Sequence, residues 1–222
     1  MMSESVNARQ YAPATQRNRE PILEVLLQVL PPTGTVLEVS SGTGEHAAFF
    51  APRLHPRCWI PSDPNPVARA SIAAWREYCP ADNLYPPLAL DACDPVWVVE
   101  QNESQVLPNI DFKHNPIVAI ANINMIHIAP WSACLGLMAG ARRILPPGGI
   151  LYLYGPFKQG GKHTAASNVA FDENLQAQNP EWGVRDLDEV VVAAQAQNLS
   201  LVKTYTMPAN NLSVIFQHNP LP

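Results

Sequence analysis

The sequence lacks the features that would place the chain in a membrane or on a nucleic acid. No stretch approaches the ~18 consecutive apolar residues of a spanning helix, and residues 1–20 are polar, without the apolar core of a secretory signal. Only 14 Lys and Arg stand against 19 Asp and Glu, so the formal net charge is -5. No basic stripe suited to a phosphate backbone is present. We therefore expect a cytoplasmic protein that binds neither membrane nor nucleic acid.

Cysteine is scarce and widely spaced. Cys58, Cys79, Cys93 and Cys134 form no Cys-x-x-Cys pair and have no histidine partner at zinc-finger spacing. Because this spacing is typical of buried reduced thiols, we expect no disulfide bond and no metal site. The chain also has no Gly-x-Ser-x-Gly turn, so the sequence does not indicate a hydrolase of that type.

Proline, in contrast, is abundant, with 23 residues. This is roughly twice the average usage, but the prolines lie in short turns between apolar segments rather than in one tail. A chain of 222 residues, 47% of them apolar, is long enough to bury one complete core. We expect a single domain over residues 20–222, preceded by an N-terminal segment, residues 1–19, that can act as a lid.

Apolar runs typical of strands alternate with helix-like segments along most of the chain. Such alternation predicts an α/β protein in which helices cover both faces of a mostly parallel sheet, as in a Rossmann-like three-layer sandwich. The pattern predicts seven strands in all. They are residues 35–40, 57–62, 84–90, 116–122, 149–155, 199–208 and 211–217, with helices at 21–30, from 44, 66–78, 95–106, 130–144 and 186–198.

The last two predicted strands are separated only by residues 209–210. A parallel crossover needs about a dozen residues, so this connection predicts an antiparallel hairpin at the end of the sheet. Residues 156–184 show weak periodicity, and loops of that length are usually functional. We interpret this segment as an insertion at the active site.

The turn after the first predicted strand, within residues 35–50 (TVLEVSSGTGEHAAFF), indicates a ligand site. A phosphate-binding Walker loop is excluded because its lysine is missing. Gly42, Gly44 and Ala47 fit the looser dinucleotide pattern Gly-x-Gly-x-x-Ala. However, Glu38 places an acid inside the preceding strand, and an anion there suits the cationic amino-acid end of a ligand better than a pyrophosphate.

Two further acids follow the next two predicted strands. Asp63 lies 19 residues after Gly44, where a carboxylate can accept hydrogen bonds from both hydroxyls of a ribose. Asp91 is followed by the small Ala92, a pair that suits an adenine ring and its amino group. The alternative for either acid is an ordinary helix cap.

In these features the chain resembles the class I S-adenosylmethionine (SAM) dependent methyltransferases. More narrowly, it is similar to the methyltransferase-like 26 family, a family first described as a domain of unknown function. The stretches that carry this resemblance are RNREPILEVL, VLEVSSGTGEHAAFFAP, WIPSD, NMIHIAPW, LYGPFK, FDENLQAQNPEWGVRDLDEV and MPANNLSVIF. The resemblance covers residues 20–217 and implies the fold and the cofactor SAM, but not the methyl acceptor.

Further cofactor contacts are expected on either side of the glycine turn. Ser40 precedes the glycines, and Asn122 lies at the end of the fourth predicted strand. Arg17 and Asn18, before the first predicted helix, can fold over the cofactor. The alternative for these two residues is an ordinary helix start, although arginine is unfavourable there.

Asn124 and His127 follow the same strand and are the candidate catalytic residues. Methyl transfer from a sulfonium is an in-line displacement, so a base is needed only for a protonated acceptor. His127 is the candidate base, with a structural role as the alternative. Because Asn122 is not followed by the Pro-Pro-Tyr or Pro-Pro-Phe pattern of base-modifying methyltransferases, the expected acceptor is a small molecule.

The acceptor pocket is predicted in and around the inserted segment. Asp186 is expected to cap the helix that follows it, and a solvated loop is the alternative interpretation of the segment. The candidate pocket residues are Tyr154, Phe157, His163, Asn168 and Trp182.

Two other functions fit parts of the pattern. A nicotinamide-dependent oxidoreductase also uses a glycine turn followed by an acid such as Asp63, although Glu38 and the final hairpin disfavour it. A non-catalytic SAM-binding module is equally compatible with the cofactor residues. The sequence specifies neither the acceptor nor the oligomeric state.

Overall fold

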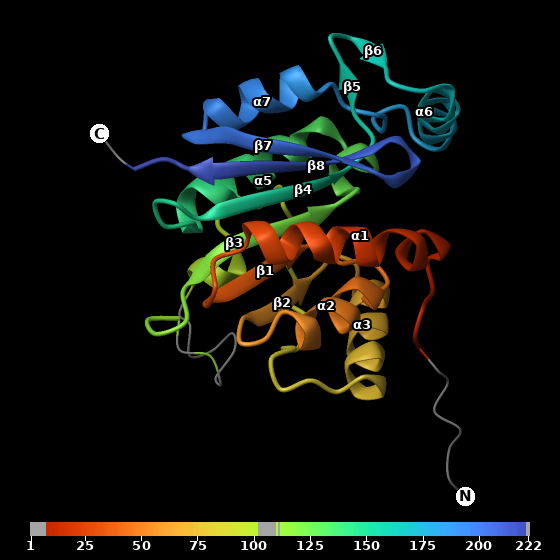
Figure 1. Cartoon of the computed structure of the whole chain (residues 1–222). Helices are drawn as coiled ribbons and strands as arrows, with labels where there is room; N and C mark the ends of the chain where they lie inside the picture. The colour runs from red at the N-terminus through yellow and green to blue at the C-terminus, as the bar shows by residue number, and fades with distance from the viewer. Residues whose placement is uncertain (1–7, 102–109, 111, 221–222) are drawn as a thin grey trace, which may run out of the picture.

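The computed structural model describes residues 8–101, 110 and 112–220, and its centre is a six-stranded sheet (Figure 1). The strand order is β2-β1-β3-β4-β8-β7. The first four of these strands pair in parallel, and β8 runs antiparallel to both β4 and β7. The bounds are β1 Thr35–Val39, β2 Cys58–Ser62, β3 Ile117–Ile123, β4 Ile150–Gly155, β7 Leu199–Met207 and β8 Asn211–His218. The mainly parallel sheet and its terminal antiparallel hairpin confirm two sequence predictions.

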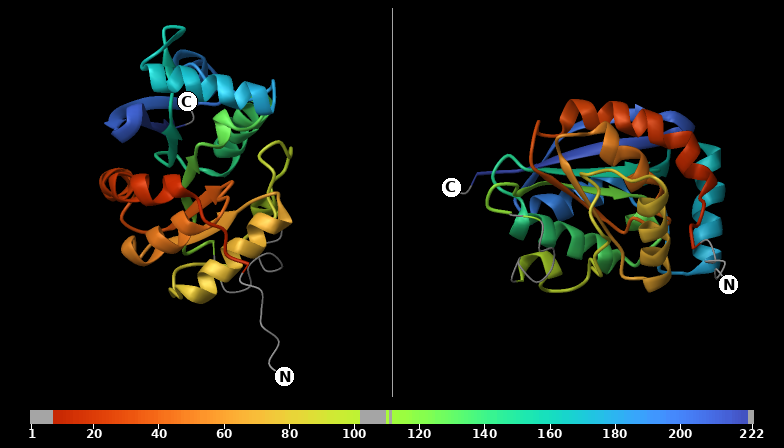
Figure 2. Two further views of the ribbon diagram at one scale, coloured as in Figure 1. Left: turned by 90° about the vertical axis from the view of Figure 1, so that its right-hand side faces the viewer. Right: turned by 90° about the horizontal axis from the view of Figure 1, so that it is seen from below.

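Helices cover both faces of this sheet (Figures 1 and 2). Val36 packs in an apolar cluster with α1 and α2, whereas its neighbour Leu37 packs in a second cluster with α5 and α7. Alternate residues of β1 thus serve opposite faces, as expected for a sheet covered on both sides. The helices are α1 Pro13–Val29, α2 Glu45–Arg53, α3 Pro66–Tyr78, α5 Trp131–Ile144, α6 Ala166–Gln178 and α7 Leu187–Gln195.

The predicted strand at residues 84–90 does not form a full ladder, so the prediction of seven strands was wrong. Leu84 and Leu88 make only isolated parallel bridges, to Trp59 and Ser62 of β2. The cause is in the sequence YPPL, because two prolines lack the N–H groups that a continuous ladder requires.

The first helix begins earlier than the sequence indicated. We predicted a start at Pro21, but α1 already begins at Pro13, which occupies the favoured first-turn position. Pro21 therefore lies inside the helix, and Arg17 and Asn18 are helical residues. α1 also crosses the boundary predicted at residue 19, while residues 1–7 of the predicted lid lie outside the described residues.

Two other segments differ from their sequence predictions. Of the helix predicted at 95–106, the described part contains only the short 3-10 helix Val98–Glu100, and residues 102–109 lie outside the description. The inserted segment is not an irregular loop. It contains a small hairpin, β5 Lys158–Gln159 and β6 Lys162–His163, followed by α6.

The inserted segment and the strand ends lie on the same side of the molecule. The left panel of Figure 2 looks onto the carboxyl ends of β3 and β4, with α6 above them and α1 beside them. The turn between β7 and β8 reaches the same region, because the Asn210 side chain donates to the Ser167 hydroxyl of α6 at 3.1 Å. Residues from four parts of the chain therefore surround the end of the sheet where ligands bind in open α/β folds.

No described helix is both long and apolar enough to cross a membrane. The described part of the chain also contains no cluster of three or more His, Cys, Asp or Glu side chains that could hold a metal ion. Each of the four cysteines is a free thiol in this structure.

Candidate functional site

The loop from β1 to α2 carries the two glycines predicted to bind a ligand. Ser40, Gly42 and Gly44 all adopt left-handed backbone, with φ of 58°, 56° and 87°. A Cβ atom at Gly44 would lie 2.7 Å from the Ile72 Cα of α3, whereas one at Gly42 would meet no heavy atom within 4 Å. The loop thus packs tightly on α3 at Gly44 and leaves open space at Gly42, as expected where backbone approaches a ligand.

Asp63 lies directly opposite this loop. Its Oδ2 accepts a hydrogen bond from the Gly42 backbone N–H at 3.0 Å, and its Oδ1 accepts one from the Asn65 N–H at 2.9 Å. The cap of α3 is Asn65, whose side chain accepts from the Val67 N–H. Asp63 is therefore not the helix cap, and the structure brings it to the glycine turn as the ribose hypothesis requires.

Glu38 is buried near the carboxyl end of β1, with 1% of its surface exposed. Its Oε2 accepts a hydrogen bond from the Trp59 indole Nε1 at 2.9 Å. Burial raises the pKa of Glu38 to about 7, although the hydrogen bonds from Trp59 and Ser41 oppose this shift. The carboxyl group is thus poised between its charged and neutral forms near neutral pH.

Asp91 and Ala92 follow the extended segment beside β2. Asp91 is exposed, and its Oδ1 accepts a hydrogen bond from the Cys93 backbone N–H at 2.9 Å, while Ala92 is buried. The Asp91 side chain therefore makes a local turn contact and remains accessible. Its adenine-binding role stays a prediction.

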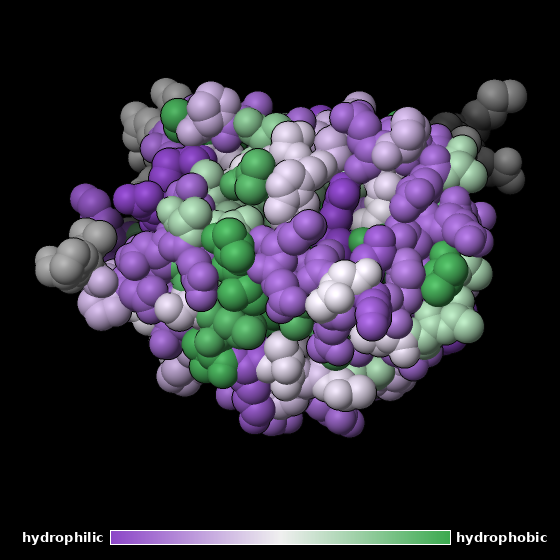
Figure 3. All heavy atoms as spheres, turned by 90° about the horizontal axis from the view of Figure 1, so that it is seen from above, coloured by the Kyte–Doolittle hydropathy of each residue, from purple (hydrophilic) through white to green (hydrophobic). Residues whose placement is uncertain are grey.

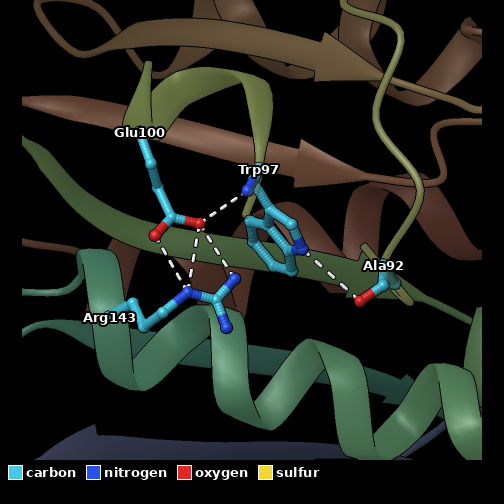
Figure 4. Close-up of polar contacts among 4 residues, drawn as sticks. All are labelled: Ala92, Trp97, Glu100 and Arg143. Carbon is cyan, nitrogen blue, oxygen red and sulfur yellow. Dashed lines mark hydrogen bonds and ion pairs between the residues drawn. The ribbon is translucent and has the colours of Figure 1, made fainter. Parts of the chain in front are cut away.

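The residues after Ala92 are held against α5, as Figure 4 shows. The Trp97 indole N–H donates to the Ala92 carbonyl at 3.4 Å, and the Glu100 carboxylate accepts hydrogen bonds from the Arg143 guanidinium at 2.9 Å and from the Trp97 backbone at 2.6 Å. Gly140 of α5 makes room for the indole, because a Cβ there would lie 2.1 Å from a ring carbon of Trp97. These contacts fix the loop that carries the predicted adenine site.

Asn122 lies near the end of β3, beside β1. Its Nδ2 donates to the Val39 carbonyl at 2.9 Å. Its Oδ1 is buried and has no hydrogen-bond partner among the described residues. Since buried amide oxygens normally have a donor, this atom indicates a position for a ligand.

The predicted lid residues on α1 differ in exposure. Arg17 is exposed, whereas Asn18 is buried and its Oδ1 lies 2.8 Å from the His46 Nε2. Asn18 also lies near the hydroxyl of Tyr154 and lines the same cavity, and burial raises the pKa of Tyr154. Asn18 therefore connects α1, α2 and the end of β4.

Residues 8–12, which we call the N-terminal arm, cross α3 and reach the glycine turn. The Gln10 N–H donates to the Ser71 hydroxyl, which donates in turn to the Thr43 carbonyl, both at 2.7 Å. The Trp75 indole N–H donates to the Gln10 carbonyl at 2.9 Å, and the Arg9 guanidinium lies 3.5 Å from the centre of the Tyr78 ring. The arm thus contacts both α3 and the glycine turn. This arrangement was not predicted from the sequence.

A cavity of about 260 Å³ lies over the carboxyl ends of β3 and β4. Predicted pocket residues Tyr154 and Asn168, the predicted catalytic residue Asn124 and the predicted lid residue Asn18 all line it. The other lining residues are Ala14, Pro156, Ser167, Phe171, Ala209 and Asn211. This cavity, which we call the acceptor cavity, brings together four of the sequence-predicted site residues from separate elements.

His127 lies fully buried below this region. Its Nδ1 accepts a hydrogen bond from the Arg185 backbone N–H at 3.2 Å, so the hydrogen of the neutral ring is on Nε2. That Nε2 is buried without a partner among the described residues, and Phe157 packs edge-on at 4.8 Å. Burial lowers the His127 pKa to about 3. The remaining nitrogen is a donor, so the geometry favours a positioning role for His127 over the predicted general base.

Asp172 of α6 is a buried acid that sequence reasoning missed. Its Oδ2 lies 2.7 Å from the Lys158 Nζ and 3.0 Å from the His163 Nε2, and its Oδ1 accepts a hydrogen bond from the Val184 N–H at 2.8 Å. The predicted pocket residue His163 is thus paired with Asp172. No sequence pattern indicates this cluster, because its members meet only through the tertiary packing of the inserted segment.

Trp182 and Asp186 follow α6. Trp182 is half-buried and does not line the acceptor cavity. Asp186 caps α7 as predicted, since its side chain accepts a hydrogen bond from the Asp188 N–H at 2.8 Å.

A larger groove, of about 660 Å³, opens between α5 and α7. It is lined by exposed apolar side chains that include Leu135 and Val192, with Arg185 and Glu189 among its polar residues. Figure 3, which views the molecule from the α7 side, shows apolar areas among polar ones on this face. The groove contains none of the predicted site residues, so the smaller acceptor cavity is the better candidate site.

The family model described as "Protein of unknown function (DUF938)" matches residues 9–218. The chain belongs to the DUF938 family. This match covers the glycine turn, Asp63, Asp91 and the inserted segment of the DUF938 chain. The narrower resemblance to the methyltransferase-like 26 family stays a prediction.

Several solved structures with a similar fold are described as methyltransferases. An O-methyltransferase family protein from Burkholderia thailandensis has a TM-score of 0.72 and 14% identity, over 94% of this chain and 58% of that one. An O-methyltransferase family 2 protein from Planctomyces limnophilus, in complex with apigenin, has a TM-score of 0.67 and 17% identity, over 90% of this chain and 61% of that one. The DUF938 chain thus spans less than two thirds of these proteins.

A third similar structure matches over most of its own chain. It is the complex of the Haloferax volcanii Trm112 methyltransferase activator with a protein described as a methyltransferase. The TM-score is 0.67 at 15% identity, over 93% of this chain and 92% of that one. At these low identities the likeness shows that the DUF938 chain has a methyltransferase fold.

Proposed function

We propose that the protein is a SAM-dependent methyltransferase that transfers a methyl group to a small-molecule acceptor. The observation that carries this proposal is the hydrogen bond from the Gly42 N–H to the Asp63 carboxylate at 3.0 Å. It joins an open glycine turn to an acid at the end of the neighbouring strand, the arrangement that suits a ribose-containing cofactor. SAM, when bound, supplies a methyl group on a positively charged sulfur.

The residues around the turn fit this cofactor chemically. Open space at Gly42 admits a ligand next to the backbone, and the buried Asn122 Oδ1 offers an unused acceptor. We assign Asp63 to the ribose hydroxyls, and Glu38 and Asn122 to the amino-acid end. Asp91 and Ala92 are assigned to the adenine, with Ser40, Arg17 and Asn18 as further contacts.

The acceptor cavity supplies the other half of the site. Asn124 and Tyr154 line it at the ends of β3 and β4, and Asn168 lines it from α6. Transfer by in-line displacement depends mainly on alignment and on exclusion of water, and side chains from several elements line the cavity where they could align an acceptor. We assign His127 and Phe157 to support of its floor, and we propose His163 and Trp182 as outer contacts of the acceptor.

Cofactor binding tests this proposal directly. S-adenosylhomocysteine at about 100 times its dissociation constant should stabilise the protein by roughly 2.7 kcal/mol. At roughly 2–4 °C per kcal/mol, thermal-shift measurements should show several degrees of increase. Asp63→Ala should weaken this binding about tenfold or more, because charge-assisted hydrogen bonds contribute roughly 1.5–3 kcal/mol each. The exposed acid variant Asp82→Ala is the matched control and should bind like the wild type.

NADH serves as the competing ligand in the same experiment. A shift with NADH but none with S-adenosylhomocysteine would contradict the methyltransferase proposal and favour an oxidoreductase. Tight binding of S-adenosylhomocysteine without turnover of any acceptor in a broad screen would favour the non-catalytic module.

A further inference from the structure

The acceptor cavity is lined by apolar, amide and hydroxyl side chains and carries no charged one. None of its described lining residues is Asp, Glu, Lys, Arg or His. Tyr154 is the ionisable residue among them, and burial raises its pKa, so its hydroxyl stays protonated near neutral pH. The cavity therefore presents no side chain ready to remove a proton from a bound molecule.

His127 does not fill this role from below. Its Nδ1 is already the acceptor of the Arg185 N–H at 3.2 Å. Its Nε2 faces Gly155, where a Cβ atom would lie 2.5 Å away. Because that nitrogen carries the hydrogen in the neutral ring, it can donate a hydrogen bond but cannot accept a proton.

Two amide groups in the cavity have a fixed orientation. The Asn168 Nδ2 donates to the Asn210 carbonyl at 3.1 Å, and the Asn211 Nδ2 donates to the Pro208 carbonyl at 3.0 Å and to the Ala209 carbonyl at 3.3 Å. A backbone carbonyl can only accept, so the nitrogen of each amide must face it. The Oδ1 atoms of Asn168 and Asn211 have no donor among the described residues and remain as acceptors for a ligand.

We propose that the methyl acceptor is a small uncharged amine that is methylated on nitrogen. This inference rests on the function proposed above. The amine N–H groups would donate to the free amide oxygens of Asn168 and Asn211. The cavity volume of about 260 Å³ corresponds to about nine water molecules at ~30 Å³ each, so the expected acceptor has about ten non-hydrogen atoms.

Nitrogen is the nucleophile that this cavity suits. The lone pair of the neutral amine forms the N–CH₃ bond while the S–CH₃ bond of SAM breaks and returns its electron pair to sulfur. The positive charge passes from sulfur to nitrogen, and the ammonium product loses its proton to water after release. An alcohol would need a base before transfer, and a thiolate would need a cationic side chain beside it, which the described lining residues do not include.

The first experiment compares acceptors that differ in one atom. Aniline, phenol and thiophenol, with further triplets of small skeletons whose amines are uncharged at the assay pH, are tested at pH 8.5 for binding to the S-adenosylhomocysteine complex by calorimetry. Turnover with labelled SAM is measured in parallel. We expect binding and methylation of amines from this set and neither for the matched alcohols and thiols.

The second experiment tests the amide oxygens. Asn168→Ala and Asn211→Ala should each lower amine affinity roughly 2- to 10-fold, as loss of one neutral hydrogen bond predicts, while S-adenosylhomocysteine affinity is unchanged. Asn174→Ala, an exposed residue of α6, is the matched control and should bind amines like the wild type.

The outcomes separate this inference from the proposed function. If an alcohol or thiol is methylated in preference to the amine, the amine assignment is overturned. It is also overturned if the cofactor binds but no amine in any triplet binds or is methylated. In both cases cofactor binding still stands. The amine assignment is also overturned if Asn168→Ala and Asn211→Ala bind amines as tightly as the control Asn174→Ala does. Failure of S-adenosylhomocysteine to bind the wild type removes the proposed function itself.

Discussion

Glu38 is a carboxyl group that the fold buries almost completely and pairs with the neutral Trp59 indole. Burial raises its pKa from 4.5 to about 7. Between these two pH values the folded protein holds a proton that the unfolded chain has already lost. The free energy of unfolding therefore falls as pH rises through this window.

Glu38→Gln should remove this pH dependence. Relative to the variant, the wild type should lose about 3 kcal/mol of unfolding free energy between pH 4.5 and 7, at ~1.36 kcal/mol per pKa unit. Urea denaturation of both proteins at several pH values measures the difference. Glu24→Gln, which changes an exposed residue of α1, should keep the wild-type slope. Parallel slopes for Glu38→Gln and wild type would show that the carboxyl titrates normally.

The two glycines of the turn should respond differently to the same substitution. Gly42→Ala adds only the strain of a left-handed alanine, roughly 1–2 kcal/mol, because its Cβ meets open space. Gly44→Ala adds the same strain and also a steric clash, because its Cβ would lie 2.7 Å from the Ile72 Cα. The α3 backbone would have to move away, which costs roughly 1–3 kcal/mol more in stability. Chemical denaturation should rank Gly44→Ala below Gly42→Ala in stability, and the reverse order would refute this packing argument.

At the scale of elements, one buried hydroxyl links the N-terminal arm to the glycine turn. Ser71 accepts the Gln10 N–H and donates to the Thr43 carbonyl. Ser71→Ala should release the arm, because an unsatisfied buried group costs roughly 1–3 kcal/mol. Hydrogen exchange should then increase over residues 8–12 and around the glycine turn but not in α1. Ser132→Ala, at an exposed position of α5, is the control, and unchanged exchange in Ser71→Ala would show that other contacts hold the arm.

Sequence patterns predicted the elements whose burial follows a simple period. β1, β3 and β4 are apolar runs, and α3 occupies residues 66–78 as predicted. α6 was missed because it buries polar residues: its buried positions are Asn168, Asp172 and Leu175. Apolar periodicity cannot reveal a helix whose packing depends on an ion pair and an amide network.

At the scale of the whole molecule, the half of the candidate site that we assign to the cofactor was the more predictable half. Parallel strands end at one edge of a sheet, so an acid or amide after a strand has a known location without coordinates. This placed Asp63 beside Gly42 and Asn122 beside β1. The acceptor half depends on contacts such as Asn168 with Asn210, which are 42 residues apart and meet only after the inserted segment folds over the terminal hairpin.

The contact between Trp59 and Glu38 also gives the protein an optical property. Trp59 is one of five tryptophans in the chain and is fully buried. Its indole N–H lies 2.9 Å from the Glu38 Oε2, and a charge that appears at one end of an indole changes the energy of its excited state. The fluorescence of Trp59 should therefore depend on whether this carboxyl is ionised. The emission of this one side chain thus reports the charge of the Glu38 carboxyl below the glycine turn.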